Sequence, residues 1–93
     1  MLKLRKGVST VELDDGTALL DEHRGQYWNL NPTGALVLRA LLRGESEEEA
    51  ARLLSQEYAV DAETARDDVR ELVEHLSSAG LVVSTRRPTG AST

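Results

Sequence analysis

Few residues in this 93-residue chain are of the types that carry out catalysis or bind metals. The two histidines, His23 and His75, have no nucleophile or metal-ligand partner at a recognised spacing. Asp67 and Asp68 are neighbours on a predicted helix, so their carboxylates point in different directions and do not form an acid–base pair. The absence of cysteine excludes disulfides, thiolate metal sites and cysteine nucleophiles. The sequence therefore favours a protein that is not an enzyme and that uses no metal and no cofactor.

The charge distribution and the hydropathy argue against two classes of partner. The formal net charge is -5, and acidic residues dominate between residues 45 and 74. An acidic body repels nucleic-acid phosphates, so nucleic acid is not an expected partner. No apolar run approaches the roughly 20 residues that span a bilayer, and the first residues lack the apolar region of a signal peptide. We therefore expect a cytoplasmic protein with no membrane partner.

The segment at 27–34, Tyr-Trp-Asn-Leu-Asn-Pro-Thr-Gly, holds two of the three aromatic residues of the chain. Its first residues favour a strand. Asn31 then suits the N-cap of a helix, and Pro32 suits the first helical position, where a missing N–H costs nothing. The sequence thus predicts a strand that runs directly into a helix. A free edge on that strand, with its aromatic side chains, would suit the binding of an extended peptide.

The strand at 26–30 is expected to follow two others in a hairpin-connected meander. The Asp-Gly pair at 15–16 predicts a two-residue turn, because a type I′ turn needs positive φ at both central positions. That turn places Leu13 opposite Ala18, with Glu12 and Leu19 together on one face. The other face is apolar and consists of Val11, Leu13, Ala18 and Leu20.

The next connection has two possible lengths. A three-residue loop at 23–25 would set Leu20 opposite Trp28, so that Trp28 and Leu30 extend the apolar face toward the core. Tyr27 and Asn29 would then lie on the other face. A four-residue loop would instead put Tyr27 on the apolar face. We favour the three-residue loop, which leaves the strand at 26–30 at an edge of the sheet.

Three helices are predicted after the strands. The first spans 32–42, and the second begins at a capping box formed by Ser46 and Glu49 and continues to residue 58. The third spans 61–79 and has Asp61 as its N-cap. The apolar segment that follows is either a last strand or a packing tail. The residues predicted to be buried on these helices are Leu36, Val37, Ala40, Leu41, Ala50, Leu53, Leu54, Tyr58, Ala62, Ala65, Val69, Leu72, Val73, Leu76 and Ala79.

A groove is expected between the third strand and the third helix. The apolar stripe of that helix is mainly core, and residues at its margins are available to line the groove. Arg66 and Arg70 flank one margin, whereas Asp68 and His75 flank the other. The sequence leaves open which margin faces the strand.

Several of these segments together resemble one family. They are the segment at 27–35, an aliphatic helix ending at Gly44, the pairs Ala50-Ala51 and Leu53-Leu54, and the run from Leu76 through Gly80-Leu81-Val82. With them the chain resembles the PqqD-like proteins, and within that group the stand-alone leader-recognition proteins of lasso-peptide biosynthesis. The likeness covers residues 8–83, and its most specific part is the Leu-Asn-Pro-Thr-Gly junction at 30–34.

The resemblance implies an α+β, winged-helix-like domain called a RiPP recognition element, over residues 1–85. The polar composition of residues 86–93, with Pro88 and Gly90, separately predicts a disordered tail. Such a domain binds the leader of a ribosomally made precursor peptide as an extra strand beside 26–30, against the helix at 61–79. It presents the precursor to a transglutaminase-like cysteine protease, and an ATP-dependent cyclase then closes the ring. The implied leader-contacting positions are Tyr27, Trp28, Asn29, Leu30, Asp68, Val69, Leu72, Val73 and Leu76.

Two other functions stay open at this point. A PqqD-like protein can instead serve a radical-SAM or other modifying enzyme, with the same mode of peptide binding and a different client. A winged-helix regulator would bind DNA, but that function needs a basic recognition helix, and the helix at 61–79 is mainly acidic.

Overall fold

The structure is a computed structural model and describes residues 2–84. The expected tail at 86–93 therefore lies outside the described residues. The elements, in chain order, are β1 (Leu2–Leu4), β2 (Val8–Leu13), β3 (Gly16–Asp21), β4 (Gln26–Leu30), α1 (Pro32–Leu42), α2 (Glu47–Tyr58), α3 (Ala62–Ser78) and β5 (Val82–Ser84).

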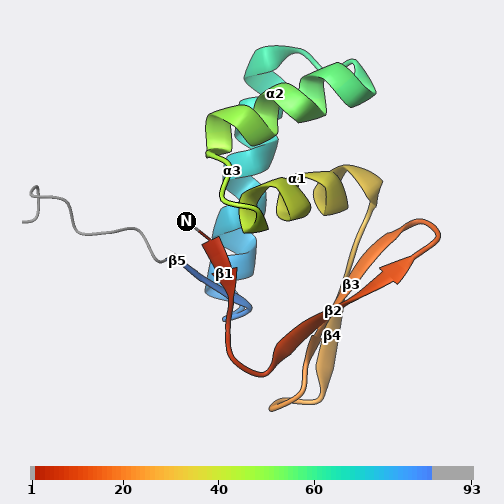
Figure 1. Cartoon of the computed structure of the whole chain (residues 1–93), viewed down its shortest axis with the longest axis vertical. Helices are drawn as coiled ribbons and strands as arrows, with labels where there is room; N and C mark the ends of the chain where they lie inside the picture. Colours follow the sequence, from red (N-terminus) through yellow and green to blue (C-terminus); the bar gives the residue numbers. More distant parts are fainter. Residues whose placement is uncertain (1, 85–93) are drawn as a thin grey trace, which may run out of the picture.

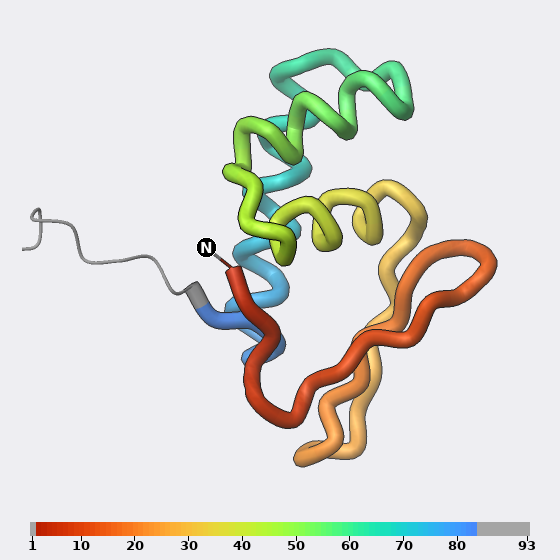
Figure 2. The backbone as a smooth tube through the Cα atoms, viewed as in Figure 1, coloured from red at the N-terminus to blue at the C-terminus, as the bar shows by residue number. Residues whose placement is uncertain are grey.

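Strands β2, β3 and β4 form an antiparallel meander in that order, which places β4 at an edge. The three helices follow and gather on one side, while the sheet extends away from them (Figure 1). This α+β, winged-helix-like arrangement confirms the predicted fold class. β5 pairs with β1 in a second sheet, so the two ends of the described chain lie side by side (Figure 2). β1 is an element that the sequence patterns did not predict.

The first hairpin differs from its predicted register by two residues. Val11 lies opposite Ala18, because the loop consists of residues 14–15. Gly16 has a φ of 144° and opens β3, where a Cβ would collide with the carbonyl oxygen of Leu30. This contact with β4 requires the glycine inside the strand, so the turn forms one position earlier. A shift of two residues keeps each side chain on its predicted face.

The second hairpin also differs from the favoured prediction. Its loop has four residues, 22–25, so Leu20 lies opposite Tyr27 and not opposite Trp28. Tyr27 therefore shares the face of Leu20, whereas Trp28 lies opposite Leu19 on the other face.

The side chain of Asp21 explains the longer loop. Its Oδ1 accepts hydrogen bonds from the N–H groups of His23 at 3.1 Å and Arg24 at 3.3 Å. The carbonyl of Asp21 accepts a further bond from the N–H of Gly25 at 2.9 Å. An aspartate that bonds the backbone two and three residues ahead stabilises this turn in place of the three-residue alternative.

The buried face of the sheet is the one that carries Leu19, which is 0% exposed. This face packs against α1, and Thr17 and Asp21 are buried on it. The four-residue apolar face that we expected to extend toward the core points outward instead, with Val11 and Leu13 exposed. The prediction placed Trp28 and Leu30 on the face of Leu20 and took that face as the buried one. Both points differ in the structure, and the two differences cancel. Trp28 and Leu30 therefore lie on the core side as predicted, with Tyr27 and Asn29 on the other side.

All three predicted helix caps are present. The side chains of Asn31, Ser46 and Asp61 each accept a hydrogen bond from the backbone N–H three residues later. Tyr58 is exposed, contrary to prediction, because α2 ends there and Ala59 adopts a left-handed conformation with φ of 54°. Ala62, in the first turn of α3, is also exposed. The helical residues that are buried are Ala35, Val37, Leu38, Ala40, Leu41, Ala50, Ala51, Leu54, Ala65, Val69 and Leu76.

Candidate functional site

The free edge of β4 offers backbone groups that the register identifies. The N–H of Glu22 donates to the carbonyl of Gly7 at 2.9 Å, so the even-numbered residues of β3 bond to β2. Successive residues of a central strand bond to opposite neighbours, so the odd-numbered residues of β3 bond to the even-numbered residues of β4. Tyr27 and Asn29 therefore direct their N–H and C=O groups toward the free edge.

A groove of about 440 Å³ lies beside this edge, between β4 and the C-terminal half of α3. Leu76 is buried at its base, and Trp28 is 43% exposed in its wall. The walls are mainly apolar, with a few polar side chains among them. The lining residues are Trp28, Asn29, Leu30, Leu72, His75, Leu76, Ser78 and Ala79.

A second hollow of about 310 Å³ continues from this groove toward the start of α1. Leu72 and His75 line both spaces, so the two form one surface along α3. Asp68 and Glu71 line the second hollow, and neither has an ion-pair partner among the residues that the structure describes. The surface is thus apolar at one end and acidic at the other.

The residues singled out in the sequence occupy four different places. Tyr27 points its side chain to the outer face of the sheet. Val69 is only 1% exposed and belongs to the core, and Val73 packs against that core. Asp68 lines the acidic hollow. The five that line the groove itself are Trp28, Asn29, Leu30, Leu72 and Leu76.

The structure also determines which margin of α3 faces β4. His75 lines the groove and Asp68 lines the adjoining hollow, whereas Arg66 lines a separate hollow between α2 and α3. His75 and Ala79 were not among the predicted site residues. Each lies three residues after Leu72 or Leu76, so helical spacing was the signal that could have found them.

The groove is a surface suited to recognition, with apolar side chains beside a free strand edge. Among residues 2–84, no group of three His, Asp or Glu side chains could hold a metal ion. The hydrogen bond from the Thr64 backbone N–H lowers the pKa of Asp61, but that carboxylate caps α3 and does not line the groove. No helix in the described part of the chain is long and apolar enough to cross a membrane.

Comparison with known proteins agrees with this fold. Residues 16–82 match the family described as "Coenzyme PQQ synthesis protein D (PqqD)". The chain belongs to this family and is a PqqD-like RiPP recognition element. Among curated protein sequences, none matches it at a significant level.

Two solved structures share the fold over almost the whole chain. One, described as "Lasso peptide synthetase B1 complexed with the leader peptide", is 37% identical with a TM-score of 0.83, and the alignment covers 89% of this chain and 98% of that one. The other, "TbiB1 in Complex with the TbiA(beta) Leader Peptide", is 27% identical with a TM-score of 0.80 and covers 91% and 99%.

Proposed function

We propose that this protein is a non-catalytic adaptor that binds the leader of a ribosomally made precursor peptide in lasso-peptide biosynthesis. The leader adds as a strand to the free edge of β4, and its side chains enter the groove against α3. The adaptor then delivers the bound precursor to a leader-cleaving cysteine protease of the transglutaminase-like type. An ATP-dependent cyclase acts after leader removal and is a further candidate partner.

The observation that carries this proposal is the free β4 edge beside an apolar groove. Tyr27 and Asn29 direct unpaired backbone groups to the edge, where an added strand can satisfy them. Side chains alternate along a strand, so every second side chain of an added peptide would point toward Leu72 and Leu76. Main-chain bonds would supply affinity, and the groove would supply specificity.

The two similar solved structures support the identity of the ligand. Both are described as complexes with a leader peptide, and one shares 37% of its residues with this chain. For the implied contact positions, the edge and groove support backbone contacts from Tyr27 and Asn29 and side-chain contacts from Trp28, Leu72 and Leu76. Val69 and Val73 would act by supporting the helix from the core side.

Delivery to a protease needs a second surface, and the outer face of the sheet is suited to it. This outer face carries Val11, Leu13, Leu20 and Tyr27, which are 43%, 47%, 36% and 66% exposed. Several exposed apolar side chains on one face are a common feature of protein-binding surfaces. Because the groove lies on the opposite side of β4, a leader and a protein partner can bind together.

A proline substitution at the free edge tests the binding mode. Asn29→Pro removes an N–H that points to the edge, so it should weaken binding of a labelled synthetic leader, measured by fluorescence anisotropy. Thr10→Pro is the matched control, because even-numbered residues of β2 point to the opposite edge of the sheet. Equal affinity of the folded Asn29→Pro and Thr10→Pro variants would reject strand addition at β4.

The family match favours one alternative function. PqqD-like proteins can instead present a peptide to a radical-SAM or other modifying enzyme, with the same groove and a different client. A cleavage assay separates the two functions: the lasso-peptide role requires that the protein accelerates removal of the leader by a leader-cleaving cysteine protease. The mainly acidic surface of α3 gives no support to DNA binding.

A further inference from the structure

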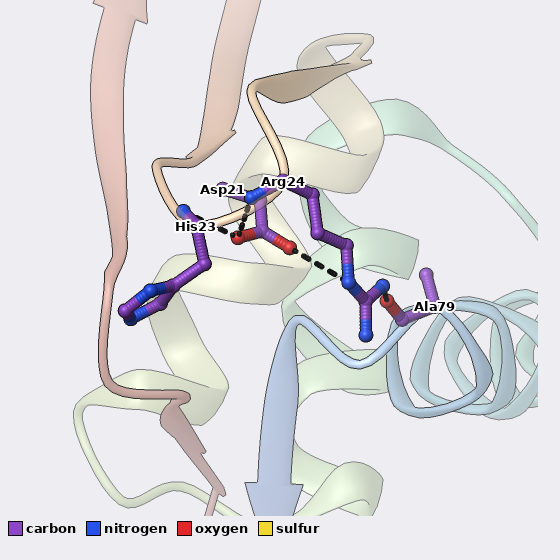
Figure 3. Close-up of polar contacts among 4 residues, drawn as sticks. All are labelled: Asp21, His23, Arg24 and Ala79. Carbon is purple, nitrogen blue, oxygen red and sulfur yellow. Dashed lines mark hydrogen bonds and ion pairs between the residues drawn. The ribbon is translucent and has the colours of Figure 1, made fainter.

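One side chain joins the two walls of the groove. Arg24 lies in the loop between β3 and β4, and its Nη1 donates a hydrogen bond to the carbonyl oxygen of Ala79 at 3.0 Å (Figure 3). Ala79 follows the last turn of α3 and lines the groove. The loop that leads into β4 is therefore tied directly to the end of the facing helix.

Asp21 holds Arg24 in the orientation that this bond requires. Asp21 is only 6% exposed, and its carboxylate already accepts hydrogen bonds from the backbone N–H groups of His23 and Arg24. Its Oδ2 lies 3.6 Å from the Nε of Arg24 (Figure 3). Because the loop backbone fixes the carboxylate, the guanidinium group has a stationary partner, unlike an ordinary pair of exposed charges.

The end of α3 is shaped to receive the guanidinium group. The carbonyls of the last helical turn have no partner within the helix, and Arg24 supplies one to Ala79. Gly80 follows with a φ of 75°, and a Cβ at that position would lie 3.2 Å from Nη2 of Arg24. Glycine thus permits both the end of the helix and the close approach of the arginine.

Few direct contacts join the two walls. The β3–β4 loop also reaches the residues after α3 indirectly, through the β1–β2 connection: the N–H of Glu22 donates to the carbonyl of Gly7, and the N–H of Arg5 donates to that of Leu81, each at 2.9 Å. In the described part of the chain, α1 packs against both β4 and α3, and no comparable backbone packing joins β4 to α3. α1 lies at the end of the groove where β4 runs into Asn31. Arg24 joins the walls at the other end, where β4 begins.

We propose that Arg24 is a positioning residue for peptide binding, which sets the separation of β4 and α3 at the open end of the groove. The proposal rests on the proposed function and assigns Arg24 no contact with the peptide. A groove that is already at its bound width spares the peptide the cost of ordering the two walls. Loss of the Arg24–Ala79 bond would let the β3–β4 loop move away from the helix.

The test uses Arg24→Met, which keeps the aliphatic stem and removes the charge and the donors. We expect about tenfold weaker binding of the labelled synthetic leader, mainly through faster dissociation. Trp28 is the only tryptophan and lines the groove, so its emission in the free protein should also shift. Arg24→Lys keeps the charge and one donor group, so it should recover part of the leader affinity and part of the wild-type Trp28 emission. Arg43→Met removes an exposed arginine that pairs with Glu45, and it should change neither the leader affinity nor the Trp28 emission.

The outcomes separate this proposal from the proposed function. Wild-type protein that fails to bind the leader would reject the proposed function, while the Trp28 emission of free Arg24→Met would still test the positioning role. Leader binding and emission that match wild type in folded Arg24→Met would overturn the positioning role alone. If Arg24→Met does not fold, Arg24→Lys decides: wild-type binding and emission in that variant would reduce Arg24 to a stabilising residue and overturn the proposal.

Discussion

Trp28 lies directly opposite Leu19 in the pairing of β3 with β4, yet Leu19 is fully buried and Trp28 is 43% exposed. The two side chains share one face of the sheet, but α1 packs more extensively against β3 than against β4. The exposed part of the indole forms a wall of the groove. The same face of the sheet thus contributes to the core on β3 and to the site on β4.

Trp28→Ala should weaken leader binding far more than it destabilises the fold. Tryptophan is among the residue types that contribute most of the binding energy at interfaces, and Trp28 lies in the wall of the groove. We expect a loss of about 10- to 100-fold in affinity, measured by anisotropy, with a cooperative thermal transition retained. Tyr27→Ala is the control, because that side chain points to the outer face. Equal effects of the two substitutions would place the ligand elsewhere.

Two residues one turn apart on α3 should separate binding from stability. Leu72 is half-buried and lines the groove, so Leu72→Ala should mainly weaken leader binding. Val69 is 1% exposed and does not line the groove. Val69→Ala should therefore mainly lower the free energy of unfolding, by about 1–3 kcal/mol. Denaturant unfolding and leader titration of both variants check this division, which a larger binding defect in Val69→Ala would contradict.

Local structure, such as the helix caps, was predictable from the sequence. Contacts between segments far apart in the sequence were not. The caps at Asn31, Ser46 and Asp61 depend on residues within one turn, and all three were identified. The first hairpin register depends on the approach of Gly16 to Leu30 from the next strand, which no local pattern reveals. The β1–β5 pairing joins the two ends of the described chain and was equally hidden.

The candidate site divides in the same way. The edge position of β4 and the opposite directions of Trp28 and Tyr27 followed from the meander and the strand period. The margin of α3 that faces β4 depends on how the helix packs on α1 and α2. Helical spacing placed His75 on one margin of α3, but it did not show that this margin faces the groove. The contact of Arg24 with Ala79 spans 55 residues and arises from a loop whose length was predicted wrongly.

Stability at low pH should depend on Asp61. Hydrogen bonds from the backbone N–H and then the hydroxyl of Thr64, at 2.8 and 3.2 Å, lower the pKa of this carboxyl below its ordinary value of 3.8. A depressed pKa means that the folded state favours the ionised form. Its stabilising contribution is therefore complete above the ordinary value and is lost as the pH falls through the lower folded value.

Asp61→Asn isolates this effect, because asparagine keeps the cap and cannot ionise. Unfolding followed from about pH 5 down to about pH 2 should show a smaller loss of stability in Asp61→Asn than in wild type. Glu63 is exposed and lies two residues after Asp61, so Glu63→Gln is the control for a general change in charge. Identical pH profiles for wild type and Asp61→Asn would show that the cap does not titrate in this range.

The outer face of the sheet should affect leader removal without affecting leader binding. Tyr27→Ser and Leu13→Ser replace exposed apolar side chains on that face, so each should change stability by no more than about 0.5 kcal/mol. Leader affinity should stay close to wild type, since the groove lies on the other side of β4. Loss of apolar contact area should instead slow cleavage of the bound precursor by the cognate protease.

Tyr58→Ser provides the matched control for the outer face. Tyr58 is 44% exposed at the end of α2, away from the sheet, so its replacement removes a similar aromatic surface from another part of the molecule. Cleavage rates should be compared at saturating leader, so that a difference reports contact with the protease and not occupancy of the groove. If Tyr27→Ser and Leu13→Ser support cleavage as well as Tyr58→Ser does, the protease docks on a different surface. If they slow cleavage while leader affinity is retained, one strand serves two partners: the edge and inner face of β4 hold the peptide, and its outer face meets the protease.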